Sequence, residues 1–187
     1  MSFPSFTAGD VLTATDMNAV GLWKITETIV TAGSTSSISF NNCFTSSYAN
    51  YRINIDQFVP STASIGPNLR MRVGGVDNTT TNYNWSFVGL YEDNTSTNAA
   101  NTGQTSANLG IFNSTNTLFL GSATVDMFSP ALAIRTHMQL NSILYNAKFG
   151  GRTGYAVHNV ETAYDGFTIF VTSGNISQIR VRVYGYK

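Results

Sequence analysis

Hydrophobic and polar residues alternate with a period of two along most of the chain. This spacing is typical of β-strands with one buried face, because successive side chains of a strand point to opposite sides. The clearest examples are residues 48–58 and 69–73, where apolar residues alternate with polar or charged ones. The same pattern predicts further strands at residues 24–31, 38–40, 83–91, 109–112, 118–128 and 134–145.

The C-terminal region predicts a β-hairpin. Residues 167–171 and 179–183 alternate, and the four residues between 171 and 176 contain a glycine and favour a turn. About ten strands separated by turn-forming residues indicate an all-β fold, either an antiparallel β-sandwich or a jelly roll. No pattern long enough for a helix separates the strands, which argues against a parallel α/β sheet.

Two segments interrupt the alternation. Residues 93–108 consist almost wholly of Asn, Thr, Ser, Ala, Gly and Gln. They have no apolar period, so we expect a long exposed loop. Residues 150–154 contain three glycines. They lack the flanking strand and helix of a phosphate-binding loop, and we expect a mobile turn there.

The N-terminal residues differ from the rest and predict an extended arm with one short helix. The sequence Thr-Ala-Thr-Asp at residues 13–16 resembles a capping box that opens a helix reaching about residue 20. So short a helix is marginal in isolation, so it must dock on its own domain or on a neighbour. We therefore expect a docking arm at residues 1–21 and a β-domain at residues 22–187. The expected apolar anchors of the arm are Phe3, Phe6, Val11, Leu12 and Met17.

Composition supports a folded, weakly charged domain. The length of 187 residues favours one domain with a sizeable core. Only 11 % of residues are charged, against a usual value of about 25 %, and Ser, Thr and Asn make up about a third of the chain. Ten basic and ten acidic residues are scattered without runs. Nucleic-acid binding needs a basic cluster, so we expect no nucleic-acid partner.

The single cysteine, Cys43, excludes a disulfide framework and a thiolate metal site. The N-terminus has no basic region followed by an apolar run, so we expect no signal peptide. No stretch approaches the roughly 20 apolar residues that span a bilayer, so no membrane insertion is expected. The sequence thus predicts a soluble protein made in the cytoplasm.

Candidate catalytic and metal-binding residues are few. The only histidines are His137 and His158, and His158 precedes Glu161 by three residues. Side chains three apart in a strand point to opposite faces, so we expect a surface or interface histidine rather than an acid–base pair with Glu161 or Asp165. No hydrolase, nucleotide-binding or metalloprotease motif occurs, and we expect no enzyme and no cofactor.

Acidic residues at predicted turns provide the remaining metal candidates. Asp77, Glu92 and Asp93 carry oxygen ligands of the kind that calcium takes, but they lack the spacing of an EF-hand. We therefore expect no metal site.

Four aromatic residues permit two interpretations. Tyr83, Trp85, Tyr91 and Tyr155 would form a platform for stacking of sugars if they faced solvent. The simpler and favoured alternative is that they fill the core and a subunit interface.

The sequence resembles virion proteins of tailed bacteriophages, often those of marine and cyanobacterial hosts. The resemblance is carried by the leader FTAGDVLTATDMN at residues 6–18, YRI at 51–53, NYNW at 82–85, AYDGFTI at 163–169 and RVYGY at 182–186. In that family a leader of the type F-x-A-G-D-V-L-T-A precedes a fibre or a small β-domain. The resemblance implies a virion component, commonly trimeric, and transfers no catalytic residues.

The expected function is that of a virion surface structural protein that docks through its N-terminal arm. Its partners would be major capsid or tail proteins. The absence of a long shaft favours head decoration, as a cement protein or head fibre. One alternative is a tail fibre or receptor-binding module that contacts host glycans through residues 93–108. Another is a free carbohydrate-binding lectin, which leaves the arm unexplained.

Overall fold

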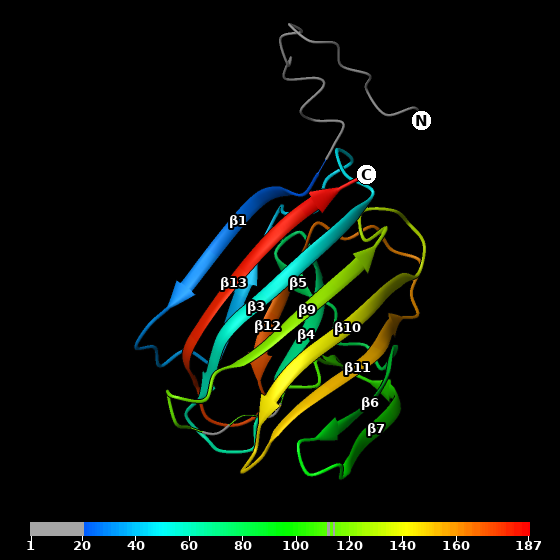
Figure 1. Cartoon of the computed structure of the whole chain (residues 1–187). Helices are drawn as coiled ribbons and strands as arrows, with labels where there is room; N and C mark the ends of the chain where they lie inside the picture. Colours follow the sequence, from blue (N-terminus) through cyan, green and yellow to red (C-terminus); the bar gives the residue numbers. More distant parts are fainter. Residues whose placement is uncertain (1–20, 112, 114) are drawn as a thin grey trace, which may run out of the picture.

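The computed structural model describes residues 21–111, 113 and 115–187 (Figure 1). The expected arm and helix, with Phe3, Phe6, Val11, Leu12 and Met17, lie outside the described residues. The strands are β1 (Trp23–Val30), β2 (Ser37–Phe40), β3 (Asn50–Pro60), β4 (Pro67–Val73), β5 (Val76–Asp77), β6 (Tyr83–Tyr91), β7 (Ser96–Gln104), β8 (Ala107–Asn108), β9 (Gly121–Phe128), β10 (Thr136–Tyr145), β11 (Phe149–His158), β12 (Gly166–Val171) and β13 (Ile176–Tyr186).

The strands form two antiparallel sheets. The large sheet has eight strands in the order β1-β13-β3-β9-β10-β11-β6-β7, and the small sheet has the order β2-β12-β4-β5, with β8 also paired to β4. Figure 1 shows the small sheet behind the large one. The all-β, antiparallel prediction is confirmed, whereas the jelly-roll alternative stays a prediction. Among the described residues there is no helix that would be long and apolar enough to span a membrane.

The core lies between the sheets and consists of the inward half of each alternating strand. On β3, Tyr51, Ile53 and Ile55 are fully buried. Aromatic rings link the two layers, since Phe44 lies 4.7 Å from Tyr51 of the large sheet and 5.6 Å from Phe167 of the small sheet, centroid to centroid. Each fully buried large apolar side chain contributes about 1.5–3 kcal/mol to folding. The facing apolar surfaces therefore hold the layers together.

The predicted C-terminal hairpin is wrong. Strand β12 lies in the small sheet between β2 and β4, whereas β13 lies in the large sheet between β1 and β3. The chain between them crosses from one layer to the other, helped by Gly174 with a φ of 67°. Ser61 at the end of β3 holds the crossing, because its backbone and hydroxyl bond the Asn175 backbone, each at 2.8 Å. Two alternating strands with a short connection fit a hairpin and a layer crossing equally well.

The predicted loop at residues 93–108 and turn at residues 150–154 are also wrong. The first segment contains β7 and β8, and the second lies within β11. Both β7 and β11 lack an apolar pattern of their own, and each forms backbone hydrogen bonds to the neighbouring strand β6, which has a buried apolar face. Conversely, the predicted strand at residues 109–112 is not observed over residues 109–111, where Leu109 and Ile111 are buried in irregular backbone.

The glycines of β11 differ in what surrounds them, which yields a stability prediction. A Cβ at Gly154 would lie 2.1 Å from the Ser86 carbonyl oxygen and 2.7 Å from Phe87 Cα. We expect Gly154→Ala to lower the free energy of unfolding by about 1–3 kcal/mol, since backbone must move. A Cβ at Gly151 would meet only the Ser142 carbonyl oxygen, at 3.9 Å. Gly151→Ala is the matched control and should change stability by less than about 0.5 kcal/mol. Urea denaturation measures both, and equal effects would contradict the observed packing.

Candidate binding groove on the large sheet

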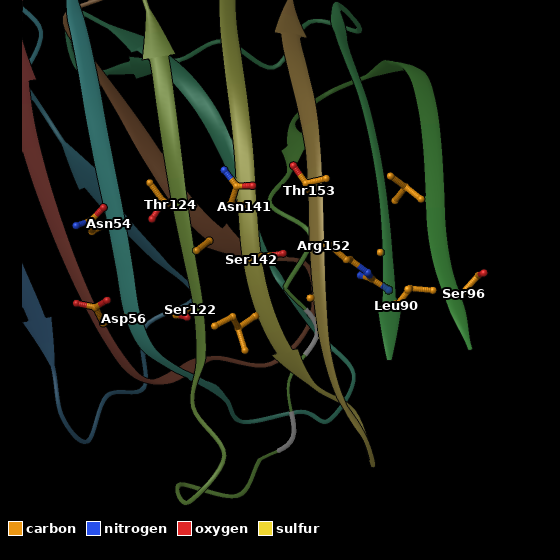
Figure 2. Close-up of a pocket in the computed structure, with 15 residues that line it drawn as sticks. Asn54, Asp56, Leu90, Ser96, Ser122, Thr124, Asn141, Ser142, Arg152 and Thr153 are labelled. Carbon is orange, nitrogen blue, oxygen red and sulfur yellow. The ribbon is translucent and has the colours of Figure 1, made fainter. Parts of the chain in front are cut away.

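A groove of about 950 Å³ hollows the outer face of the large sheet (Figure 2). Its lining comes from six neighbouring strands, β3, β9, β10, β11, β6 and β7. The start of β1 lies at one end of the sheet, where Trp23 pairs with Gly185 and Gly185 with Tyr51. The groove lies towards the other end, where β11 begins and β6 ends.

One side of the groove is polar and uncharged apart from a single carboxylate. Asn54 of β3, Thr124 of β9 and Asn141 of β10 project from this face in Figure 2. They point outward because the alternate residues of the same strands, such as Ile53 and Val125, are fully buried in the core. Hydroxyls and amides both donate and accept hydrogen bonds, so this side suits a ligand with polar groups of both kinds.

The other side carries exposed aliphatic side chains, beside Thr153 of β11 and Ser96 of β7. Val88 and Leu90 of β6 and Ile143 of β10 each expose more than half of their surface. Between them lies Gly151, which pairs with Ile143 on one side and with Leu90 on the other. A Cβ at this position would have open space above it. Packing within the domain therefore does not require a glycine here, and its missing side chain deepens the groove. Glycine within a strand often marks a bulge, a tight bend or the close approach of a ligand or another backbone, and the register of β11 with β10 and β6 has no bulge here.

Three aromatic rings lie just outside the groove lining, near the end of β10 and the start of β11. The Phe119 ring stacks on Tyr145 with centroids 4.0 Å apart, and Phe149 lies 5.7 Å from Phe119. Tyr145 follows Ile143 by two residues and pairs with Phe149, so these side chains share the outer face of the sheet. This group, here called the aromatic cluster, continues the apolar side of the groove.

The charges around the groove are paired. Asp56, the carboxylate in the lining, forms an ion pair with Arg182 of β13, and this hydrogen bond raises the pKa of Arg182. Arg152 is among the lining residues, but its guanidinium is bonded within the domain: Nε donates to the Thr97 hydroxyl at 3.0 Å and Nη1 to the Gly110 carbonyl at 3.1 Å. The groove therefore presents a nearly neutral surface.

The aromatic platform, the less favoured of the two interpretations, does not form. Tyr83 is fully buried, and its hydroxyl accepts from the Met71 amide and donates to the Asn78 carbonyl, both at 2.9 Å. Trp85 is also in the core and stacks on Phe87. Tyr91 is half-buried, and Tyr155 is exposed on the opposite, outer face. The core alternative thus describes Tyr83 and Trp85 correctly.

The prediction of a surface histidine at position 158 is wrong. His158 is fully buried at the end of β11, stacks on the Tyr83 ring at 4.1 Å and has its Nε2 2.6 Å from the Tyr164 hydroxyl. Its partner is therefore a tyrosine, while Asp165 accepts a hydrogen bond from the Gly74 amide at 2.8 Å. Burial lowers the pKa of His158 to about 4, so the ring is neutral at physiological pH.

The acidic turn residues have protein partners. Asp77 forms an ion pair with Arg72 and accepts from the Thr168 hydroxyl at 2.6 Å. Asp93 forms an ion pair with Lys148, which lowers the pKa of Asp93 to about 2. Over residues 21–111, 113 and 115–187 no group of three or more His, Cys, Asp or Glu side chains is arranged to hold a metal ion.

The groove was missed by the sequence reasoning, although part of its signal was visible. Val88 and Leu90 are apolar at the positions of β6 that alternate with the buried Phe87, and Ile143 has the same relation to Leu144. Apolar residues on both faces of a strand in an antiparallel sheet indicate a second contact surface. What the sequence did not reveal is the register that places Gly151 between them.

No protein-family model, curated protein or solved structure matches this chain. The chemistry of the groove therefore has to be inferred from its own residues.

The buried His158 predicts a pH dependence of stability. Its pKa is about 4 when folded, against an ordinary value of about 6.5. Between these values the unfolded chain binds a proton that the folded chain does not. The free energy of unfolding should therefore be constant above about pH 6.5 and fall by about 3 kcal/mol towards pH 4, at 1.36 kcal/mol per pKa unit.

Urea denaturation across this pH range, on the wild type and on His158→Phe, measures the contribution. The free energy of unfolding of the wild type should fall relative to that of His158→Phe as the pH falls. The exposed His137, changed to Phe, is the matched control and should retain the wild-type slope. A wild-type slope that His158→Phe leaves unchanged would contradict the assignment.

Proposed function

We propose that the chain is a virion surface structural protein of a tailed bacteriophage, attached to the particle through its N-terminal leader. The leader at residues 6–18 and the four shorter motifs support this proposal through their resemblance to such proteins. The jelly-roll topology, the short leader helix and a homotrimer belong to the same proposal. Capsid or tail proteins are the partners that bind the leader.

The geometric observation that carries the proposal is the separation of the leader junction from the groove on one sheet. Residue 21 leads directly into the edge strand β1, at the end of the sheet where β13 also ends (Figure 1). The groove lies across the central and opposite strands, towards the other end. Attachment through the leader would therefore leave the groove accessible from outside.

The surface chemistry supports a role in an assembly. Ser, Thr and Asn predominate over charged residues in parts of the surface, as on β7, which has no charged residue in nine. A net charge of zero gives little mutual repulsion between neighbouring copies. We favour head decoration, as a cement protein or head fibre, because this low charge suits close packing of many copies on one shell.

A second version, a receptor-binding module, is favoured by the groove itself. A protein that only reinforces a capsid has no need of a hollowed, distal surface, whereas an adhesive module does. In this version the particle carries the chain on a tail fibre.

Deletion of residues 1–20 tests attachment. We expect the truncated protein to fold, with the circular dichroism and thermal transition of the full chain, but to be missing from purified particles. The full chain expressed in the same way is the control. Incorporation of the truncated protein at the level of the full chain would contradict leader docking.

Copy number separates the two versions. Quantitative mass spectrometry of particles should give a number of chains comparable with that of capsid subunits if the protein decorates the head. A far smaller number would contradict decoration and support the fibre version.

A further inference from the structure

We propose that the groove on the outer face of the large sheet binds a neutral oligosaccharide, with the backbone at Gly151 as its floor and the aromatic cluster as its stacking surface. The inference rests on the groove alone and does not require that the leader docks to a particle.

Gly151 leaves free space in the floor of the groove. At Gly151 no side chain covers the backbone of β11, and the exposed side chains of Ile143 and Leu90 lie on either side. Its φ is not in the left-handed region, and no neighbouring atom would obstruct a side chain. By contrast, Gly89, Gly150 and Gly154 would each bring a Cβ within 3.0 Å of other atoms. In β6 and β11, packing within the domain accounts for Gly89, Gly150 and Gly154 but not for Gly151. We therefore attribute the missing side chain of Gly151 to contact with a ligand outside the domain.

The groove is long enough for an extended ligand. The groove crosses six neighbouring strands, which at about 4.8 Å per strand spacing corresponds to about 24 Å. It is open to solvent along the sheet surface and is not an enclosed cavity. Such a shape fits an extended chain of several units better than a single small molecule.

Charged side chains at the groove form ion pairs with one another. Asp56 is neutralised by Arg182, and the neighbouring Arg52 forms a two-point ion pair with Asp126, at 2.7 and 2.8 Å. An anionic ligand such as a polyuronate or a nucleic acid would need a cation directed into the groove. The lining instead offers the amides of Asn54 and Asn141 and the hydroxyl of Thr124, which pair with sugar hydroxyls.

The apolar residues of the groove suit the C–H faces of sugar rings. Sugar rings carry faces of C–H groups that pack on aromatic and aliphatic side chains while their hydroxyls bond to polar neighbours. The lining residues Val88, Leu90 and Ile143 provide such a surface beside the polar residues, and the aromatic cluster continues it where Tyr145 pairs with Phe149. A wholly apolar partner would leave the amides and hydroxyls unpaired, which is costly.

Calorimetric titration of the purified full chain with hexasaccharides of glucose, of mannose and of galactose tests the proposal. Galacturonic-acid hexasaccharides are the charged comparison. We expect binding of at least one neutral oligosaccharide and weaker binding of the charged one. Gly151→Leu fills the groove from the outside, and we expect it to weaken binding by about tenfold or more without lowering stability.

Two further variants test the aromatic cluster against a matched control. Phe149 and Ile29 expose similar fractions, 47 % and 48 %, but Ile29 lies on β1, which does not line the groove and is five positions from β11 in the strand order. Phe149→Ala should weaken binding by about tenfold, the effect of losing one ring contact. Ile29→Ala should leave binding unchanged.

Three results would overturn the proposal: no binding of any neutral oligosaccharide, preference for the charged one, or binding that Gly151→Leu leaves unaltered. Light scattering on the same samples identifies one specific alternative. If the wild type binds no sugar and Gly151→Leu lowers its oligomeric state, the groove is an interface between copies. Failure of leader docking is measured on particles and is independent of these results.

Discussion

The large sheet has one face covered by the small sheet, and this contact determines the rest of the structure. Side chains alternate along every strand, so burying Ile53 and Ile55 of β3 against the small sheet directs Asn54 and Asp56 outward. The same rule directs Thr124, Asn141 and Ile143 to the outer face of their strands. The groove is therefore a direct consequence of how the core is packed, and it needs no additional domain or loop to build it.

Backbone pairing explains the strands that lack an apolar pattern. Once β6 is fixed by Tyr83, Trp85 and Phe87 in the core, its two edges offer hydrogen-bonding groups to β7 and β11. Strand β11 can approach closely because Gly154 has no side chain against Phe87. The same strand carries Gly151 on its other face, three residues earlier. One strand thus uses one glycine for packing inside the domain and another for the hollow outside it.

The strands with a buried face were predictable from sequence, and the connections between them were not. Alternation around Ile53 and around Met71 identified β3 and β4 because burial leaves its trace in residue type. The sheet crossing after Val171 was not predictable, since a hairpin and a crossing require the same alternation. The groove was visible only as unexpected outward apolar residues such as Val88. Its floor at Gly151 depends on the register of three strands, which no local pattern specifies.

The proposed site for a neutral sugar chain is the outer face of the large sheet, and not its loops or its edges. Two-dimensional amide NMR of the labelled protein, titrated with a neutral hexasaccharide, tests this claim most directly. We expect the largest shifts at Gly151 and its neighbours across the sheet, Asn141 and Thr124, with little change in the small sheet. Shifts confined to the small sheet or to the turns at the sheet ends would contradict it.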